Sequence, residues 1–246
     1  MAKTTGLGER LFLNEFDLSG DVGALGTIGT SQGQQELPSL RDAAQRRLGL
    51  LKDASLAYTA YFDAAAGGSH PVLSTLPQSA LVSWFTGTAA GDQTGSMIAN
   101  ATEYTPTRGA DGSLVAAIAA QANATGMEWG VAGTTGDQTF ASAAAGTYVD
   151  DYVPVFPGLA LPSTLGLIAY LHVISIGSGT ATVHVQDSTA NVTYTDISGG
   201  VFTGASGPTS QRLVIPGNIN RYLKINVAGT FSNAVIAVAL ARVITA

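Results

Sequence analysis

The chain has 246 residues, of which 46% are hydrophobic and 11% are charged, and its formal net charge is -6. This acidic balance, without a run of Lys or Arg, excludes a protein that holds nucleic acid by neutralising phosphates, and the lack of cysteine excludes disulfides and thiolate metal sites. A surface so poor in charge is weakly protected against association, which favours a homo-oligomer over a monomer.

The first part of the sequence combines one short strand candidate with a stretch dotted with glycine. The strand is expected around residues 10–14. From Gly20 to Gly33 a glycine recurs every three or four residues, which is typical of a long loop or an extended ribbon. No apolar run approaches the roughly 20 residues of a membrane span, so we expect no membrane partner and synthesis in a cytoplasm.

Residues 38–52 carry the helix signal of the sequence. Ser39 or Asp42 can cap the first turn, residues 43–45 propagate a helix, and Gly49 stands where it should end. Leucine and alanine give this segment an apolar side. The sequence therefore predicts one short helix that packs on a sheet.

Beyond this segment the hydrophobic period changes to two. Strands are predicted over residues 54–62, 80–87, 96–104, 113–123 and 127–131. The Ala-rich stretch from Leu114 to Ala122 has helix propensity, but the tight-turn signal Asp111-Gly112 before it favours a strand. These strands predict a β-sandwich or barrel-like domain over residues 1–131.

Residues 132–164 are rich in Gly, Ala, Ser, Thr and Pro, and predict a linker or arm. Strands then return at regular intervals, with turns expected at Gly177-Ser178-Gly179 and at Gly229. Short strands punctuated in this way indicate an antiparallel sandwich or jelly roll over residues 165–246. The predicted fold class is thus all-β, with two consecutive β domains and one short helix.

Motifs that carry chemistry are few. The pattern Gly-x-Ser-x-Gly occurs at residues 29–33, but it lacks the strand before and the helix after the serine that a nucleophile elbow needs. His172 and His184 could face one another across a hairpin, although no third metal ligand accompanies them. We therefore predict no metal site and no cofactor.

Two pairs of carboxylates could in principle support acid–base catalysis. Asp150 and Asp151 are adjacent, so in an extended chain they point to opposite faces, and Asp17 with Asp21 fits turn hydrogen bonding. No catalytic residue is predicted, and the chain is expected not to be an enzyme.

Aromatic side chains keep a sugar-binding alternative open. A carbohydrate-binding module would need exposed aromatic rings in the second domain. The candidates there are Tyr170, Tyr194, Phe202, Tyr222 and Phe231.

Several short segments, in order along the chain, resemble the major tail proteins of long-tailed bacteriophages, particularly those of actinobacterial hosts. The segments cover most of residues 6–131, and a looser match extends to residues 211–212 and 221–223. The principal segments are Phe16-Asp17-Leu18-Ser19-Gly20-Asp21-Val22, Leu50-Leu51-Lys52-Asp53-Ala54-Ser55-Leu56, His70-Pro71-Val72-Leu73, Tyr104-Thr105-Pro106-Thr107-Arg108-Gly109-Ala110-Asp111-Gly112-Ser113-Leu114 and Met127-Glu128-Trp129-Gly130.

The resemblance implies a structural virion protein that forms stacked rings, commonly of six copies, in a tail tube. Other tail proteins would be its partners, the genome would pass through the lumen without specific binding, and the second domain would decorate the outside. Under this interpretation the ribbon and residues 38–52 form ring contacts. The candidate contact residues are Asp21, Arg41, Arg46, Arg47 and Lys52.

Two alternatives remain at this point. A capsid-decorating virion protein would share the low charge and the sandwich domains but would bind elsewhere on the particle. A carbohydrate-binding module is the alternative from a different functional class.

Overall fold

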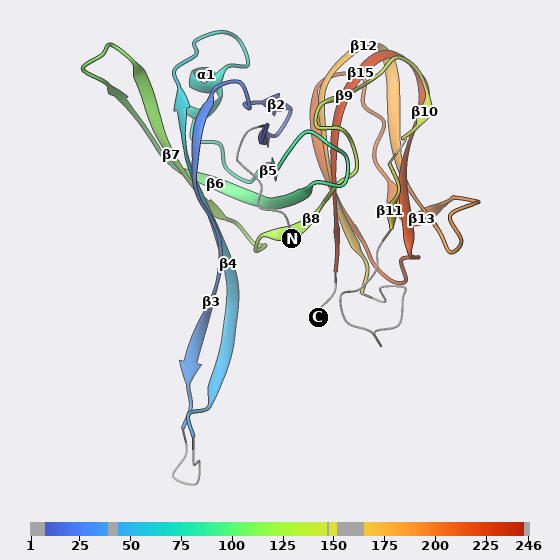
Figure 1. Ribbon diagram of the computed structural model, residues 1–246, viewed down its shortest axis with the longest axis horizontal. Coiled ribbons are helices and arrows are strands. Elements are labelled where there is room, and N and C mark those ends of the chain that lie inside the picture. Colours follow the sequence, from blue (N-terminus) through green and yellow to red (C-terminus); the bar gives the residue numbers. More distant parts are fainter. Residues whose placement is uncertain (1–7, 39–43, 147, 152–164, 244–246) are drawn as a thin grey trace. The chain divides into compact units, whose positions relative to one another are not determined.

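A computed structural model describes residues 8–38, 44–146, 148–151 and 165–243, and its regular structure is almost entirely β (Figure 1). This confirms the predicted all-β class. The elements in chain order are β1 (Arg10–Leu13), β2 (Phe16–Asp17), β3 (Val22–Glu36), β4 (Arg47–Tyr61), α1 (Ser69–Leu73), β5 (Ala80–Phe85), β6 (Gln93–Arg108), β7 (Leu114–Ala122), β8 (Glu128–Ala132), β9 (Gln138–Phe140), β10 (Ala144–Ala145), β11 (Asp150–Asp151), β12 (Leu167–Ser188), β13 (Thr195–Val201), β14 (Thr209–Ile215) and β15 (Tyr222–Arg242).

The helix predicted over residues 38–52 is wrong. Residues from Arg47 onward belong to β4, which pairs with β3 from Glu36↔Arg47 to Val22↔Ala60. Cross-strand pairing over this length outweighs the helix propensity of the leucines and alanines, because propensity is a weak preference. Both proposed caps lie in residues 39–43, outside the described residues. In the described part of the chain the helix is α1 instead.

Contacts between residues divide the chain into two compact units made of separate segments. Unit 1 comprises residues 1–20, 81–96 and 128–246, and unit 2 comprises residues 21–80 and 97–127. Strand β6 therefore contributes its first residues to unit 1 and the rest to unit 2. The division into consecutive domains over 1–131, 132–164 and 165–246 stays a prediction.

Unit 2 is built on an antiparallel sheet in the order β3, β4, β7, β6. Leu56, Tyr58 and Ala60 of β4 are buried and alternate with more exposed residues, which confirms the strand expected after residue 54. The Ala-rich segment is strand β7, as predicted, and the Asp111-Gly112 turn precedes it. In this part of β4, one face of the strand is therefore buried.

Unit 1 is dominated by one long antiparallel ribbon that folds over on itself. Strands β12 and β15 pair from Leu167↔Arg242 to Ser188↔Tyr222. The breaks predicted near Gly179 and at Gly229 are wrong, because both strands run through these glycines. Figure 1 shows the ribbon arching over, so that its two halves lie opposite each other.

The two glycines allow this arch. Gly179 has φ 81° and a Cβ added there would lie 2.0 Å from the carbonyl oxygen of Thr230. Gly229 has φ 108° and its added Cβ would lie 2.3 Å from the oxygen of Thr180. A residue with a side chain fits neither position. These glycines therefore let the backbones of β12 and β15 approach each other closely, and they do not form turns.

Folding over places the inner faces of the two halves against each other, where they form the main core of unit 1. Alternate residues along both strands are buried, as the period of two requires. The principal core residues are Leu167, Ala169, Leu171, Val173, Val183, Val185, Leu223, Ile225, Val227, Ile236, Val238 and Leu240.

Shorter strands complete the two layers. The first half of β12 pairs with β14 and its second half pairs with β13. On the other side, β8 and β9 pair with the second half of β15, and β10 and β11 pair with its first half. The predicted antiparallel sandwich is confirmed. Part of the segment expected to be a linker, residues 138–151, thus supplies three short strands.

A second, smaller core lies on the other face of the ribbon, where Tyr170 and Ala239 pack with Phe12 of β1 and Phe85 of β5. Glu128 of the Met-Glu-Trp-Gly motif accepts hydrogen bonds from the Tyr170 hydroxyl and from the Arg212 guanidinium. This polar cluster ties β8, β12 and β14 together.

Candidate interaction arm

The most exposed part of the described chain is the far end of the β3–β4 ribbon, which we call the arm and define as residues 30–37 and 46–53. Every residue in these two segments is exposed. Figure 1 shows β3 and β4 running side by side beyond the rest of unit 2. A two-stranded ribbon on its own is marginally stable in water, so an arm of this kind gains most from a partner.

Leucines make the arm apolar. Leu51 is 90% exposed and Leu48 is 52% exposed, and Leu37 and Leu50 are exposed as well. Exposing large apolar side chains so close together is unfavourable in water and marks interaction surfaces. The arm therefore carries the strongest apolar contact signal in unit 2.

Contacts between the strands keep the arm extended. The Nε2 amide of Gln32 donates a hydrogen bond to the carbonyl oxygen of Leu50 at 2.9 Å. The backbone amide of Leu37 donates one to the carbonyl oxygen of Arg46, also at 2.9 Å. The Arg47 guanidinium lies 3.4 Å from the Glu36 carboxylate. The strands thus hold each other without any core beneath them.

The arm also offers a free backbone edge. Among the described residues, β3 pairs with β4 alone. Its other edge presents unpaired N–H and C=O groups along a strand that runs from Val22 to Glu36. A strand from another chain can hydrogen-bond to such an edge.

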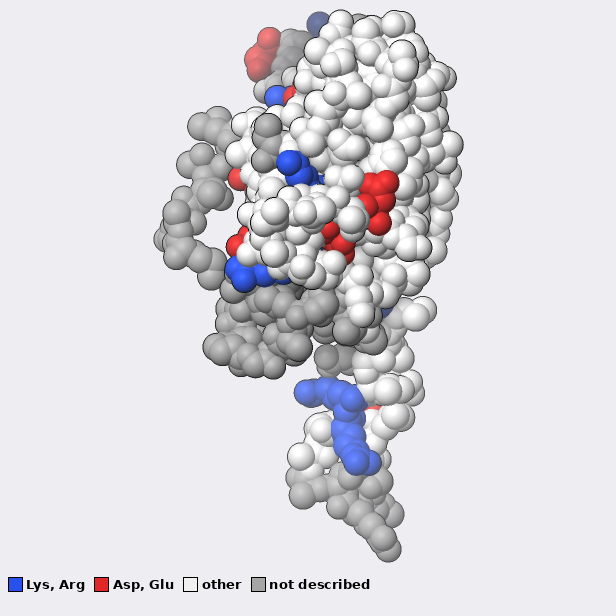
Figure 2. Space-filling model, turned by 90° about the vertical axis from the view of Figure 1, so that its right-hand side faces the viewer, with Lys and Arg blue, Asp and Glu red and all other residues white. Residues whose placement is uncertain are grey.

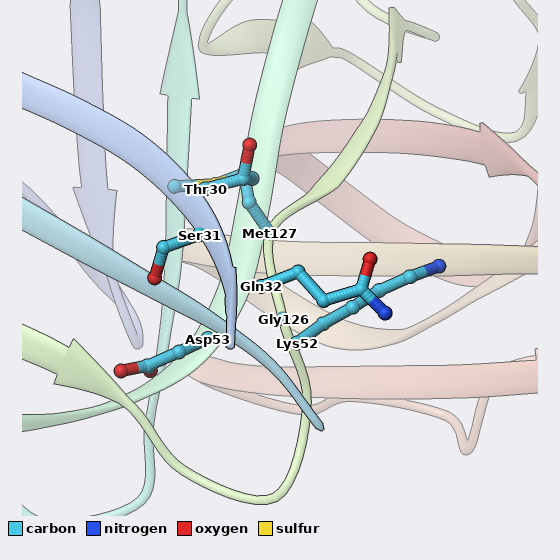
Figure 3. Close-up of a pocket in the computed structure, with 7 residues that line it drawn as sticks. All are labelled: Thr30, Ser31, Gln32, Lys52, Asp53, Gly126 and Met127. Carbon is cyan, nitrogen blue, oxygen red and sulfur yellow. The ribbon is translucent and has the colours of Figure 1, made fainter. Parts of the chain in front are cut away.

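A shallow pocket lies where the arm leaves the sheet of unit 2 (Figure 3). Gln32 and Lys52, which are paired across the ribbon, extend in one direction, while Ser31 and Asp53 extend in the other. Ser31 and Asp53 extend to the same side, but the residues that line the pocket include no histidine to act as the base for a serine nucleophile. The residues that line it are Thr30, Ser31, Gln32, Lys52, Asp53, Gly126 and Met127.

Three of the five contact residues predicted from the sequence lie on the arm. These are Arg46, Arg47 and Lys52, and all three are exposed. Figure 2 shows Lys and Arg side chains gathered on the arm. Arg41 lies outside the described residues.

Asp21 has a different setting. Its carboxylate accepts a hydrogen bond from the Ser69 amide at the start of α1, at 2.7 Å, and its carbonyl oxygen accepts one from the Tyr61 amide. These contacts hold α1 against the end of β4. Asp21 thus has a role inside unit 2, and its role between subunits stays a prediction.

Sequence reasoning missed the exposed leucines of the arm. In the sequence, Leu48 and Leu51 fit the apolar side of the helix predicted over residues 38–52. Their pairing strand, residues 30–36, is almost free of large apolar residues, and this polarity was the available signal that no core covers the segment.

The motifs examined for catalysis do not form active sites in the described residues. Ser31 lies in the middle of β3, opposite Asp53, and not at a turn from strand to helix, so the nucleophile-elbow geometry is absent. Asp150 pairs with Arg242 and Asp151 pairs with Arg221. Each carboxylate of that pair has its own cation.

The two histidines do not face each other, because both lie on β12. His172 is fully buried: its Nδ1–H donates to the Asn14 carbonyl oxygen at 2.6 Å, and its Nε2 accepts from the Ser83 hydroxyl at 2.8 Å. Burial lowers the pKa of His172 to about 4. His184 is paired with Asp196 instead. No cluster of three metal-ligating side chains occurs in the described residues.

No protein-family model and no curated protein matches the sequence. Among solved structures, the chain is similar to the Dit protein of phage SPP1, described as a paradigm of the hub adsorption apparatus in phages that infect Gram-positive bacteria. The similarity covers 96% of this chain and 99% of that chain, with 6% identity and a TM-score of 0.32. A TM-score this low does not establish a common fold.

No helix among the described residues has the length and apolarity to cross a membrane.

Proposed function

We propose that the protein is a structural subunit of a bacteriophage tail and that it assembles through its arm into the stacked rings of a tail tube. The observation that carries this proposal is the arm itself: an extended ribbon with exposed leucines and an open backbone edge. The resemblance of residues 6–131 to major tail proteins supports it independently. An ordered arm without a core beneath it is stabilised by a neighbouring copy.

The two kinds of contact on the arm have different effects. Main-chain hydrogen bonds along the β3 edge align a strand of the neighbour, and the leucines supply the apolar burial that makes the contact stable. At about 25 cal/mol per Å², burial of several leucines on each subunit contributes a few kcal/mol per contact, and a closed ring repeats that contact around its axis.

The acidic balance of the chain is compatible with this role. DNA that moves through a tube must not adhere to the wall, and a subunit with a net charge of -6 repels the phosphate backbone. A structural wall needs no catalytic site, which agrees with the expectation that the protein is not an enzyme.

Electron microscopy of the purified full-length protein tests the proposal. We expect rings or tubes at high protein concentration, and we expect Leu51→Asp to abolish them, since a charge at a buried contact costs several kcal/mol unless it is paired. The matched control is Val192→Asp, which places the same charge at a position that is 81% exposed in unit 1. This control variant should still assemble.

Two outcomes would contradict the proposal. The protein could remain a monomer at all concentrations, or Leu51→Asp could assemble as well as the control. Binding to isolated capsids without ring formation would support the capsid-decorating alternative instead.

A further inference from the structure

A second surface, on unit 1, has a composition unlike the rest of the chain. We call it the tyrosine face. It lies on the outer side of the sandwich layer that contains β11, β13 and the facing halves of β12 and β15. Its residues are Asp151, His184, Gln186, Tyr194, Asp196, Arg221, Tyr222 and Lys224.

Strand alternation directs these side chains outward. On β15, Leu223 and Ile225 point into the main core, so Tyr222 and Lys224, which alternate with them, point away from it and are half-buried. Gln186 pairs with Lys224 on one side and with Asp196 on the other, so three neighbouring strands contribute to one surface.

Both tyrosine rings are held in place by cations. The Lys224 Nζ lies 5.6 Å from the centre of the Tyr194 ring, and the Arg221 guanidinium lies 5.0 Å from the centre of the Tyr222 ring. Arg221 is itself fixed by a two-point contact, because its Nε and Nη2 donate to the two carboxylate oxygens of Asp151. The rings therefore have little freedom to lose when a ligand binds.

Polar groups beside the rings are held as firmly. The Asp196 carboxylate accepts hydrogen bonds from the Gln186 Nε2 and lies against the His184 Nδ1, both at 2.8 Å. These two contacts, that from Gln186 first, lower the pKa of Asp196, so it is ionised at neutral pH. Planar amide, carboxylate and imidazole groups are thereby lined up along the surface.

The charges of the tyrosine face balance. Arg221 and Lys224 offset Asp151 and Asp196, and Figure 2 shows small groups of both colours set in a white surface on this side of the molecule. A balanced surface gives no electrostatic advantage to a polyanion or a polycation. It suits a neutral ligand rich in hydroxyl groups.

We propose that the tyrosine face binds a neutral oligosaccharide. A sugar ring has an apolar C–H side that packs on an aromatic ring, and hydroxyl groups around its edge that pair with planar donors and acceptors. The tyrosine face presents both, already ordered, so binding costs little side-chain entropy. The affinity of one copy is modest, and an assembly with many copies would raise it through avidity.

Burial determines which of the five aromatic candidates in the second domain can contact a ligand. Tyr170, Phe202 and Phe231 are buried in the two cores of unit 1 and cannot contact a ligand. Tyr194 and Tyr222 are the two of the five that stay at the surface, and they lie on the same face.

The test is affinity electrophoresis of the full-length protein through gels that each contain one neutral polysaccharide: dextran, mannan, galactan or arabinan. We expect at least one gel to retard the protein, and we expect Tyr222→Ala and Tyr194→Ala each to weaken that retardation at least tenfold. Tyr61→Ala is the matched control, because Tyr61 is exposed but lies in unit 2. Its retardation should be unchanged.

Thermal unfolding shows whether each variant is folded, and Lys224→Gln, a surface change, replaces any variant that is not. The proposal is overturned if no gel retards the protein, if the tyrosine variants are retarded like the control, or if heparin competes as well as the neutral polysaccharide. Ring formation affects the retardation of the tyrosine variants and of the Tyr61→Ala control alike, so the difference between them tests the tyrosine face separately from the proposed tail function.

Discussion

The two long antiparallel ribbons of this protein differ in how far their side chains are buried. The β12–β15 ribbon of unit 1 folds over and buries both faces of its first half, whereas the β3–β4 ribbon of unit 2 extends into an arm on which every residue is exposed. The backbone pairing is of the same kind in both. The difference lies in the side chains and in two glycines.

Along β12 and β15, alternate residues are Leu, Val, Ile and Ala, so folding over removes a continuous apolar face from water. Along β3 the arm carries Thr, Ser and Gln, and apart from Leu37, directly after β3, its large apolar residues lie on β4. No described residue covers those leucines, which stay exposed. A ribbon with two apolar strands makes its own core, whereas the ribbon with one apolar strand leaves its leucines exposed.

The largest change in stability is expected from a substitution in the arch of unit 1. We expect Gly179→Ala to lower the free energy of unfolding by about 3 kcal/mol, because the new Cβ adds a clash with backbone to the cost of a positive φ. Gly199→Ala is the matched control: its φ is 79° but nothing lies within 4 Å of an added Cβ. Urea unfolding of both variants measures the difference, and equal losses would refute the role assigned to close backbone approach.

The second test concerns the buried histidine on the folded ribbon. The pKa of His172 falls from 6.5 to about 4 on folding because of burial, so the unfolded chain binds a proton more readily between these values. Stability is therefore full above pH 6.5 and is lost as the pH falls toward 4. Between pH 7 and pH 5 we expect a loss of about 2 kcal/mol.

Urea unfolding at both pH values measures this loss, and His172→Gln, which cannot titrate, should remove most of it. If the variant and the natural chain respond alike to pH, the acid sensitivity arises from other groups and not from His172.

The smallest effect is expected in the arm. The Arg47 and Glu36 side chains are each more than half exposed, so their ion pair is well screened by water. We expect Arg47→Ala to change the free energy of unfolding of the monomer by no more than about 0.5 kcal/mol. A loss as large as that of Gly179→Ala would mean that the arm helps to stabilise its own subunit.

The sequence patterns that predicted strands correctly involve residues close together in the chain. A period of two predicted the strands of unit 2, and Asp111-Gly112 correctly favoured a strand for an Ala-rich segment with helix propensity. The glycines were harder to interpret. Gly179 and Gly229 look like turn residues in the sequence, because a turn and a close backbone approach both require the absence of a side chain.

A contact between subunits at the five candidate residues stays a prediction. Arg46, Arg47 and Lys52 lie on the exposed arm, where Arg47 and Lys52 belong to β4 and Arg46 directly precedes it. The tyrosine face was only partly foreseeable: five aromatic residues of similar appearance were candidates, and which of them stay at the surface depends on how the ribbon folds over.

By itself, the sequence determined the all-β class, the positions of most strands and the shortage of catalytic groups, because these follow from local periodicity and composition. The tertiary structure alone decided which ribbon buries itself and which stays open, where the single helix of the described residues lies, and which tyrosines face solvent. These features depend on contacts between residues far apart in the chain, and local patterns do not record such contacts.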